Sequence, residues 1–219
     1  KLAAVLVPIQ VVVGDLHGLN TLEHQPAKIA AVEALWKTER GAALTLIGIP
    51  DEETRRTDYA IEVPKMLSLI LVHDLDGEVR GLEDFAPDHP PVAPVFFAFR
   101  IMVGMGVLML LVSWVSTFHV LKNTPLKPWL LWCLAGMTFS GWVATLAGWI
   151  VTEIGRQPWL VTGILRTADA AGDVSGAQLG ASLTAYVLTY SALLLSYMIV
   201  LTHLAGKGAA KEVTKGDVK

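Results

Sequence analysis

The chain has 219 residues and a formal net charge of −3, and 53% of its residues are hydrophobic while only 17% are charged. Soluble globular proteins carry about 25% charged residues, and the apolar residues here are gathered in blocks as long as a bilayer is thick. This composition excludes an ordinary soluble protein. It predicts an all-α integral membrane helical bundle with three full spans, a truncated first span and an extracytoplasmic loop.

The first apolar run covers residues 2–13 and is too short to span a bilayer. Lys1 supplies a positive charge before it, as in a signal peptide, but no small-residue cleavage site follows. We therefore expect residues 1–14 to be the end of a truncated transmembrane helix, so that the chain is a C-terminal fragment.

Residues 15–94 form a polar, acidic loop. Fifteen acidic residues face seven basic ones between residues 15 and 91. Within the loop, residues 26–39 predict a short helix with proline in its first turn. Ile29, Val32 and Trp36 share one face, so we expect an amphipathic helix at the lipid–water interface. The rest of the loop predicts irregular structure with short elements.

Three longer apolar segments follow and predict transmembrane helices over residues 95–121, 129–156 and 179–204. Most of the free lysines lie in the short loop 122–128 and in the tail 205–219, and short positive loops stay in the cytoplasm. The acidic loop and the loop 157–178 are then extracytoplasmic, which three alternating spans allow.

Charges near the ends of these spans mark candidate sites, because charged groups in a membrane are costly. Arg100 either snorkels to the lipid headgroups or neutralises a buried anion such as a cofactor propionate. If the third helix continues past Val151, then Trp149, Glu153 and Arg156 share one face. Glu153 then either forms an interfacial salt bridge with Arg156 or has a functional role.

Three further residues are less distinctive on their own. Lys28 and Glu33 lie either on a solvated helix face, where Glu33 pairs with Lys37 four residues on, or in a site that recognises a lipid-soluble substrate. Met102 by itself is an ordinary gap-filling methionine.

Three motifs together resemble subunit I of the cytochrome bd-type quinol (ubiquinol) oxidases, and the resemblance covers essentially the whole chain as the C-terminal half of that subunit. They are GDLHGLNTLEHQPAKIAAVEALW, FAFRIMVGMG and GWIVTEIGRQPW, the last followed by LRTADA at residues 165–170. The resemblance implies a catalytic subunit of a terminal oxidase that oxidises quinol at the outer membrane face and reduces oxygen to water.

The resemblance also implies roles for individual residues. Met102 would ligate the iron of the low-spin heme b558 and Glu153 that of the high-spin heme b595, with Arg100 beside the first heme. Arg156 would pair with heme carboxylates, and Trp149 would lie on the electron path. Lys28 and Glu33 would serve quinol oxidation, which needs a proton acceptor within reach. The third heme would be heme d or a further heme b.

The same resemblance implies the surroundings of the chain. These are a bacterial plasma membrane, oxidase subunit II, small accessory subunits, membrane lipid, ubiquinol or menaquinol as substrate, and no nucleic acid. The family's remaining heme ligands and proton-channel acids would lie upstream of Lys1. The short acidic loop resembles the branch that includes cyanide-insensitive members. Two other functions stay open: a heme-free transporter or channel in which Glu153 and Arg156 line a pathway, and a non-catalytic remnant that binds no heme.

Overall fold

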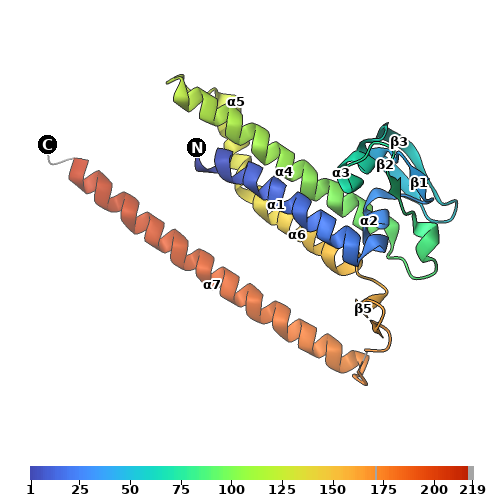
Figure 1. Cartoon of the computed structure of the whole chain (residues 1–219). Coiled ribbons are helices and arrows are strands. Elements are labelled where there is room, and N and C mark those ends of the chain that lie inside the picture. The colour runs from blue at the N-terminus through green and yellow to red at the C-terminus, as the bar shows by residue number, and fades with distance from the viewer. Residues whose placement is uncertain (171, 217–219) are drawn as a thin grey trace. The chain divides into compact units, whose positions relative to one another are not determined.

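The computed structural model describes residues 1–170 and 172–216. The chain divides into two compact units, residues 1–170 and residues 171–219. The first unit holds a bundle of apolar helices and a polar, strand-containing segment, and the second consists mainly of one long helix (Figure 1).

Within the described residues, four helical segments are long and apolar enough to cross a membrane. They are α1 (Leu2–His24), α4 (Val92–Leu121), the segment Pro128–Ile154 and the part of α7 (Gly176–Gly216) up to Leu204. The segment Pro128–Ile154 consists of α5 (Pro128–Gly136), one 3₁₀ turn, η2 (Met137–Phe139), and α6 (Ser140–Ile154). The prediction of a helical membrane protein is confirmed.

The expected end of the first helix at residue 14 is wrong, because α1 continues to His24. Gly14 and Asp15 lower the hydropathy but do not break a helix, and the next proline is Pro26. The last turns of α1 are polar, and Thr21 donates a hydrogen bond to the backbone oxygen of His17 (2.9 Å). Hydropathy therefore marked only the most apolar part of a 23-residue helix.

The helices of the first unit pack around α4. This helix lies against both α6 and α1, and Figure 1 shows the three running side by side. Trp114 on α4 donates a hydrogen bond to the backbone oxygen of Ala4 on α1 (3.0 Å). Most of the remaining helix surface is apolar and exposed, as lipid-facing helices require.

The segment between α1 and α4 is more ordered than expected. It contains α2 (Pro26–Glu33), α3 (Met66–Val72), the 3₁₀ helix η1 (Leu82–Phe85) and four strands: β1 (Glu39–Arg40), β2 (Leu44–Asp51), β3 (Arg56–Val63) and β4 (Glu78–Val79). Strands β2 and β3 form an antiparallel hairpin, and β1 pairs with β4. Figure 1 shows this segment at one end of the helix bundle.

Asp51 closes the β2–β3 turn. Its carboxylate accepts hydrogen bonds from the backbone N–H of Glu53 (2.9 Å) and from the hydroxyl of Thr54 (2.7 Å), as aspartate commonly does in turns. The neighbouring Glu52 accepts a hydrogen bond from the backbone N–H of Val92 (2.8 Å), the first residue of α4. The hairpin tip thus satisfies one of the free donors at the start of a membrane helix.

The helix α2 is the centre of the polar segment, and here the sequence prediction is wrong in two respects. The helix ends at Glu33 rather than residue 39, because Ala34 takes a left-handed conformation (φ 49°). It also does not present an apolar face to lipid, since all residues from Lys28 to Glu33 are buried within the protein. Its alanines leave room for close neighbours on every side.

A small hydrophobic core holds α2 against the ends of the membrane helices. Its buried members come from α2, η1 and the first turns of α4: Ala30, Ala31, Val32, Ala34, Leu82, Val92, Val95 and Phe96. Val151 and Ile154, in the last turns of α6, pack against it. This core fixes where the polar side chains of α2 meet α4 and α6.

After α6, the strands β5 (Trp159–Val161) and β6 (Leu165–Arg166) form a short hairpin that ends the first unit. In the second unit, α7 begins at Gly176, three residues before the predicted start of the last span. Of the predicted tail, residues 217–219 lie outside the described residues.

Candidate functional site

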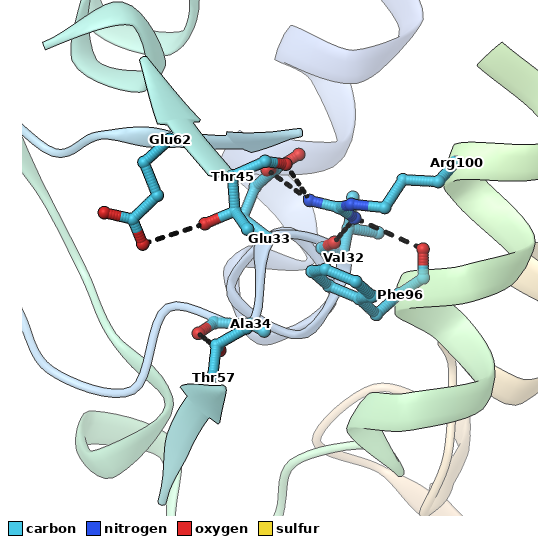
Figure 2. A network of polar contacts seen from close by, with 8 residues as sticks. All are labelled: Val32, Glu33, Ala34, Thr45, Thr57, Glu62, Phe96 and Arg100. Carbon is cyan, nitrogen blue, oxygen red and sulfur yellow. Dashed lines mark hydrogen bonds and ion pairs between the residues drawn. The ribbon is translucent and has the colours of Figure 1, made fainter. Parts of the chain in front are cut away.

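Arg100, near the N-terminal end of α4, joins three elements. Its guanidinium donates hydrogen bonds to the carboxylate of Glu33 (3.2 Å), to the backbone oxygen of Val32 (2.7 Å) and to the backbone oxygen of Thr45 on β2. It also lies over the ring of Phe96, 3.4 Å from the ring centroid. Figure 2 shows this network. One side chain thus ties α2 and the β2–β3 hairpin to a membrane helix.

The ion pair between Glu33 and Arg100 is shielded from solvent. The side chains are 6% and 16% exposed, respectively. Burial raises the pKa of Glu33 to about 7, although the positive charge of Arg100 opposes the shift. A carboxyl group that titrates near neutral pH is suited to accept and release protons.

The structure therefore contradicts the plainer interpretations of these residues. Glu33 does not lie on a solvated face or pair with Lys37; its partner is Arg100, 67 positions along the chain. Arg100 does not snorkel to the headgroups, because its guanidinium turns inward and its charge is paired. Arg100 does neutralise a buried anion, but that anion is the carboxylate of Glu33, and a contact of Arg100 with a cofactor propionate stays a prediction.

Lys28 lies on another side of α2, against the end of α6. It is 8% exposed, and its ammonium donates a hydrogen bond to the backbone oxygen of Thr152 (3.4 Å). A Cβ placed on Gly155 would lie 3.1 Å from Cγ of Lys28, so glycine at this position allows the close approach. Burial and the nearby Arg156 lower the pKa of Lys28, while Glu153 raises it.

The structure does not bring Lys28 and Glu33 to a common partner. Lys28 faces the end of α6, whereas Glu33 faces Arg100 and β2. Five positions along a helix are about 140° apart around its axis, which separates the two side chains. A shared role in quinol oxidation therefore has to use two different faces of α2.

The third predicted group lies at the end of α6. Trp149 and Glu153 are four residues apart on this helix and exposed, but the helix ends at Ile154, so Arg156 belongs to the following loop. Among the described residues, Glu153 and Arg156 form no salt bridge within 4 Å. The salt-bridge interpretation of Glu153 is therefore wrong. Arg156 is half-buried, and its Nε has no hydrogen-bond partner.

Met102 lies where α4 meets α6. It is half-buried, and its sulfur would be 3.0 Å from a Cβ placed on Gly148 of α6. Gly106, one turn further along α4, has open space beside it, since a Cβ there would meet no atom within 4 Å. The thioether of a methionine is a group that can ligate heme iron.

The donor groups fit the hemes that the resemblance implies. Met102 offers a thioether and Glu153 a carboxylate from two adjacent helices. The Nε atoms of Arg100 and Arg156 are buried without hydrogen-bond partners. Guanidinium groups bind carboxylates through short, charge-assisted hydrogen bonds, so both arginines suit heme propionates.

A pocket of about 220 Å³ lies between the start of α2 and the loop after α6. Lys28 and Arg156 contribute charged groups, and Phe85 and Trp159 contribute aromatic ones. The rest of the lining is formed by Gln25, Pro26, Ala27, Asp88, Pro90, Gly155, Gln157 and Thr162. Sequence analysis missed Gln25, Phe85 and Asp88, and no spacing in the sequence links them to the loop after α6.

An ion pair holds this loop against the polar segment. Arg166 on β6 donates a hydrogen bond to the carboxylate of Asp88 (2.6 Å) and lies 5.0 Å from the ring centroid of Trp159. The two charges are 78 positions apart, which is why sequence analysis did not pair them. Their contact fixes the wall of the pocket that Trp159 forms.

Comparison with known proteins gives consistent matches. The family model of cytochrome bd terminal oxidase subunit I matches residues 1–209. Cytochrome bd ubiquinol oxidase subunit 1 of Bacillus subtilis is 31% identical over 93% of this chain and 44% of its own length. Cytochrome bd-II ubiquinol oxidase subunit 1 of Escherichia coli is 27% identical over 89% of this chain and 51% of its own length.

The fold agrees with these sequence matches. The solved bd oxidase from Geobacillus thermodenitrificans superimposes with a TM-score of 0.75 at 30% identity, over 91% of this chain and 46% of that chain. The chain thus spans about half the length of the curated relatives it matches. With a family model matched over nearly its whole length, the chain belongs to the cytochrome bd terminal oxidase subunit I family.

Proposed function

We propose that this chain is part of the catalytic subunit of a bd-type terminal oxidase, a quinol:oxygen oxidoreductase. The subunit oxidises quinol at the outer membrane face and passes electrons through hemes to oxygen, which is reduced to water. The observation that carries this proposal is the buried pair of Glu33 and Arg100. It joins a proton-accepting group on α2 to the helix that bears the proposed heme ligand Met102, two residues after Arg100.

The proposed heme contacts follow the donor chemistry at the two helices. Met102 would hold the iron of the low-spin heme b558 and Glu153 that of the high-spin heme b595, while Arg100 and Arg156 would bind heme carboxylates. Trp149, exposed on α6 one turn before Glu153, lies beside the electron path. The hemes, including heme d or a further heme b, supply electron transfer and oxygen reduction when bound.

Glu33 is the proposed acceptor for protons released by quinol. It lies outside the membrane-spanning helices, and its pKa of about 7 matches the pH at which it would work. Arg100 holds the carboxylate in place with one hydrogen bond, from a helix that is itself fixed in the core. Lys28, which lines the pocket on the other face of α2, is the proposed contact for the quinol itself.

The proposed setting is a bacterial plasma membrane with the acidic loop outside and the C-terminus in the cytoplasm. The partners are oxidase subunit II, small accessory subunits, membrane lipid and ubiquinol or menaquinol. The uneven placement of lysines supports this orientation, and the membership of the subunit I family supports the pairing with a second subunit.

Oxygen consumption driven by a short-chain quinol tests the proposal on the full-length subunit purified with subunit II. We expect the Glu33→Gln variant to lose about 10²-fold in rate, because amide groups cannot accept the proton. Glu39→Gln is the matched control, since Glu39 is an exposed carboxylate on strand β1, away from Arg100 and its partners. Equal rates for the wild type and the Glu33→Gln variant would remove Glu33 from the reaction.

A further inference from the structure

A proton taken up by Glu33 has to leave a buried carboxyl group. The side chain of Glu33 is 6% exposed, so bulk water has little access to it. Within the described residues, one hydrogen bond reaches its carboxylate, from Nη2 of Arg100 to Oε2. The guanidinium of Arg100 has only donors and cannot take up a proton. Release of the proton therefore needs another group close to Glu33.

Thr45 on β2 is a group of this kind. The Nη2 atom of Arg100 that contacts Glu33 also donates a hydrogen bond to the backbone oxygen of Thr45, so both residues adjoin one nitrogen atom (Figure 2). Thr45 is 7% exposed, and its hydroxyl donates a hydrogen bond to Oε1 of Glu62 (3.5 Å). A hydroxyl group both donates and accepts, so it can receive one proton while it passes on its own.

Glu62 carries these contacts to the surface of the polar segment. Thr45 and Glu62 are directly opposite each other in the antiparallel register of β2 and β3, which places their side chains on one face of the hairpin. Thr45 is buried, whereas Glu62 is exposed. One hydrogen bond therefore joins the surroundings of Glu33 to a carboxylate that exchanges protons with water.

We propose that Thr45 and Glu62 form the exit for the proton that Glu33 receives. The O–H bond of the Glu33 carboxylic acid breaks as an O–H bond forms at the Thr45 hydroxyl. The hydroxyl passes its own proton to the Glu62 carboxylate, and Glu62 gives that proton to water. No electron moves, and each group returns to its starting form.

The surroundings of Glu33 favour this direction. The positive charge of Arg100 stabilises the ionised carboxylate that remains after the proton has left. Transfer between Glu33 and Thr45 tolerates one bridging water, as acid–base steps in proteins do. This inference rests on the proposed function and extends it from the uptake of the proton to its release.

Two substitutions interrupt the exit and leave the ion pair in place. Thr45→Val removes the hydroxyl but keeps the backbone oxygen that Arg100 contacts, and Glu62→Gln removes the proton acceptor at the surface. In the full-length subunit purified with subunit II, we expect each to lower kcat for a short-chain quinol about tenfold. The solvent deuterium isotope effect on kcat should rise, because proton release becomes rate-limiting. The KM and the reduced-minus-oxidised heme spectrum should stay as in the wild type.

A dissolved buffer distinguishes an interrupted exit from a disturbed fold. A high concentration of the buffer MES should restore kcat in the Glu62→Gln variant, since a dissolved base can replace the missing carboxylate at the surface. Thr45→Ser keeps a hydroxyl and should keep the wild-type kcat. Glu39→Gln is the matched control for Glu62→Gln, because Glu39 is an exposed carboxylate on β1, and it should also keep the wild-type kcat.

The outcomes separate this inference from the proposed function. In a wild-type complex that oxidises quinol, an unchanged kcat in either Thr45→Val or Glu62→Gln would overturn the exit alone. So would a lower kcat without a larger isotope effect and without rescue by MES, because the pair would then only stabilise the hairpin. A wild-type complex that oxidises no quinol, or a Glu33→Gln variant with the full rate, would overturn the proposed function first.

Discussion

Glu33 shows how one buried residue takes its properties from its surroundings. In the sequence it is a glutamate on a short helix between two lysines, and only the family resemblance distinguishes it from a solvated charge. In the structure its carboxylate is 6% exposed and held by Arg100. Burial outweighs the ion pair in setting its pKa at about 7, so the residue is both anchored and able to titrate.

This balance predicts how stability depends on pH. The folded protein favours the protonated form of Glu33 up to about pH 7, whereas the unfolded chain ionises it near its ordinary pKa of 4.5. The stabilisation of the fold by protonated Glu33 is therefore complete below pH 4.5, and it is lost as the pH rises through 7. At about 1.4 kcal/mol per pKa unit, the loss amounts to about 3 kcal/mol.

Thermal unfolding of the purified full-length protein between pH 5 and pH 8 checks this. The Glu33→Gln variant cannot ionise, so its stability relative to the wild type should rise across this range. The variant Glu39→Gln, at an exposed carboxylate on β1, should follow the wild type. A constant difference between the Glu33→Gln variant and the wild type would show that Glu33 does not titrate in this range.

At the scale of single elements, the spanning helices were predictable and their ends were not. A long apolar run has to be a helix in a membrane, because its backbone groups must be satisfied internally. Hydropathy did not show that α1 continues to His24, since its last turns are polar. It also did not show the stop of α2 at Ala34, which depends on a left-handed residue.

The candidate site was predictable as a set of residues but not as a set of contacts. The motifs pointed to Lys28, Glu33, Arg100 and Glu153 from their resemblance to a family. Sequence distance hid the pairing of Glu33 with Arg100 and of Lys28 with the end of α6, which are 67 and 124 positions apart. Only the common core of α2, α4 and α6 brings these groups together.

The β2–β3 hairpin yields a prediction at the same scale. Its tip residue Glu52 accepts a hydrogen bond from the first backbone N–H of α4, where a negative charge also meets the positive end of the helix dipole. We expect Glu52→Ala to lower the free energy of unfolding by about 1 kcal/mol, as loss of a helix cap does. Chemical or thermal unfolding measures this, with Glu53→Ala, the next exposed carboxylate, as control. Equal effects of the two substitutions would rule out the cap.

For the whole molecule, the arrangement of charge predicts the orientation in the membrane. The acidic segment between α1 and α4 should face outward, and the lysine-containing loop after α4 should face the cytoplasm. In a cysteine-free full-length protein, a membrane-impermeant maleimide added to intact cells should label Asp58→Cys and spare Thr124→Cys. Asp58 lies on β3 and Thr124 in the loop after α4. The opposite labelling pattern would show that the protein has the opposite orientation in the membrane.

The central claim is that this half of the subunit holds heme and quinol groups on neighbouring faces of α2, α4 and α6. The most direct measurement is the quinol-reduced minus oxidised spectrum of the full-length subunit purified with subunit II. The wild type should show low-spin and high-spin heme b bands, and Met102→Leu should remove the low-spin band alone. Met105 is a half-buried methionine on the same helix, and Met105→Leu should leave the low-spin band unchanged. A wild-type spectrum without heme bands, or a low-spin band that survives in Met102→Leu, would contradict the account.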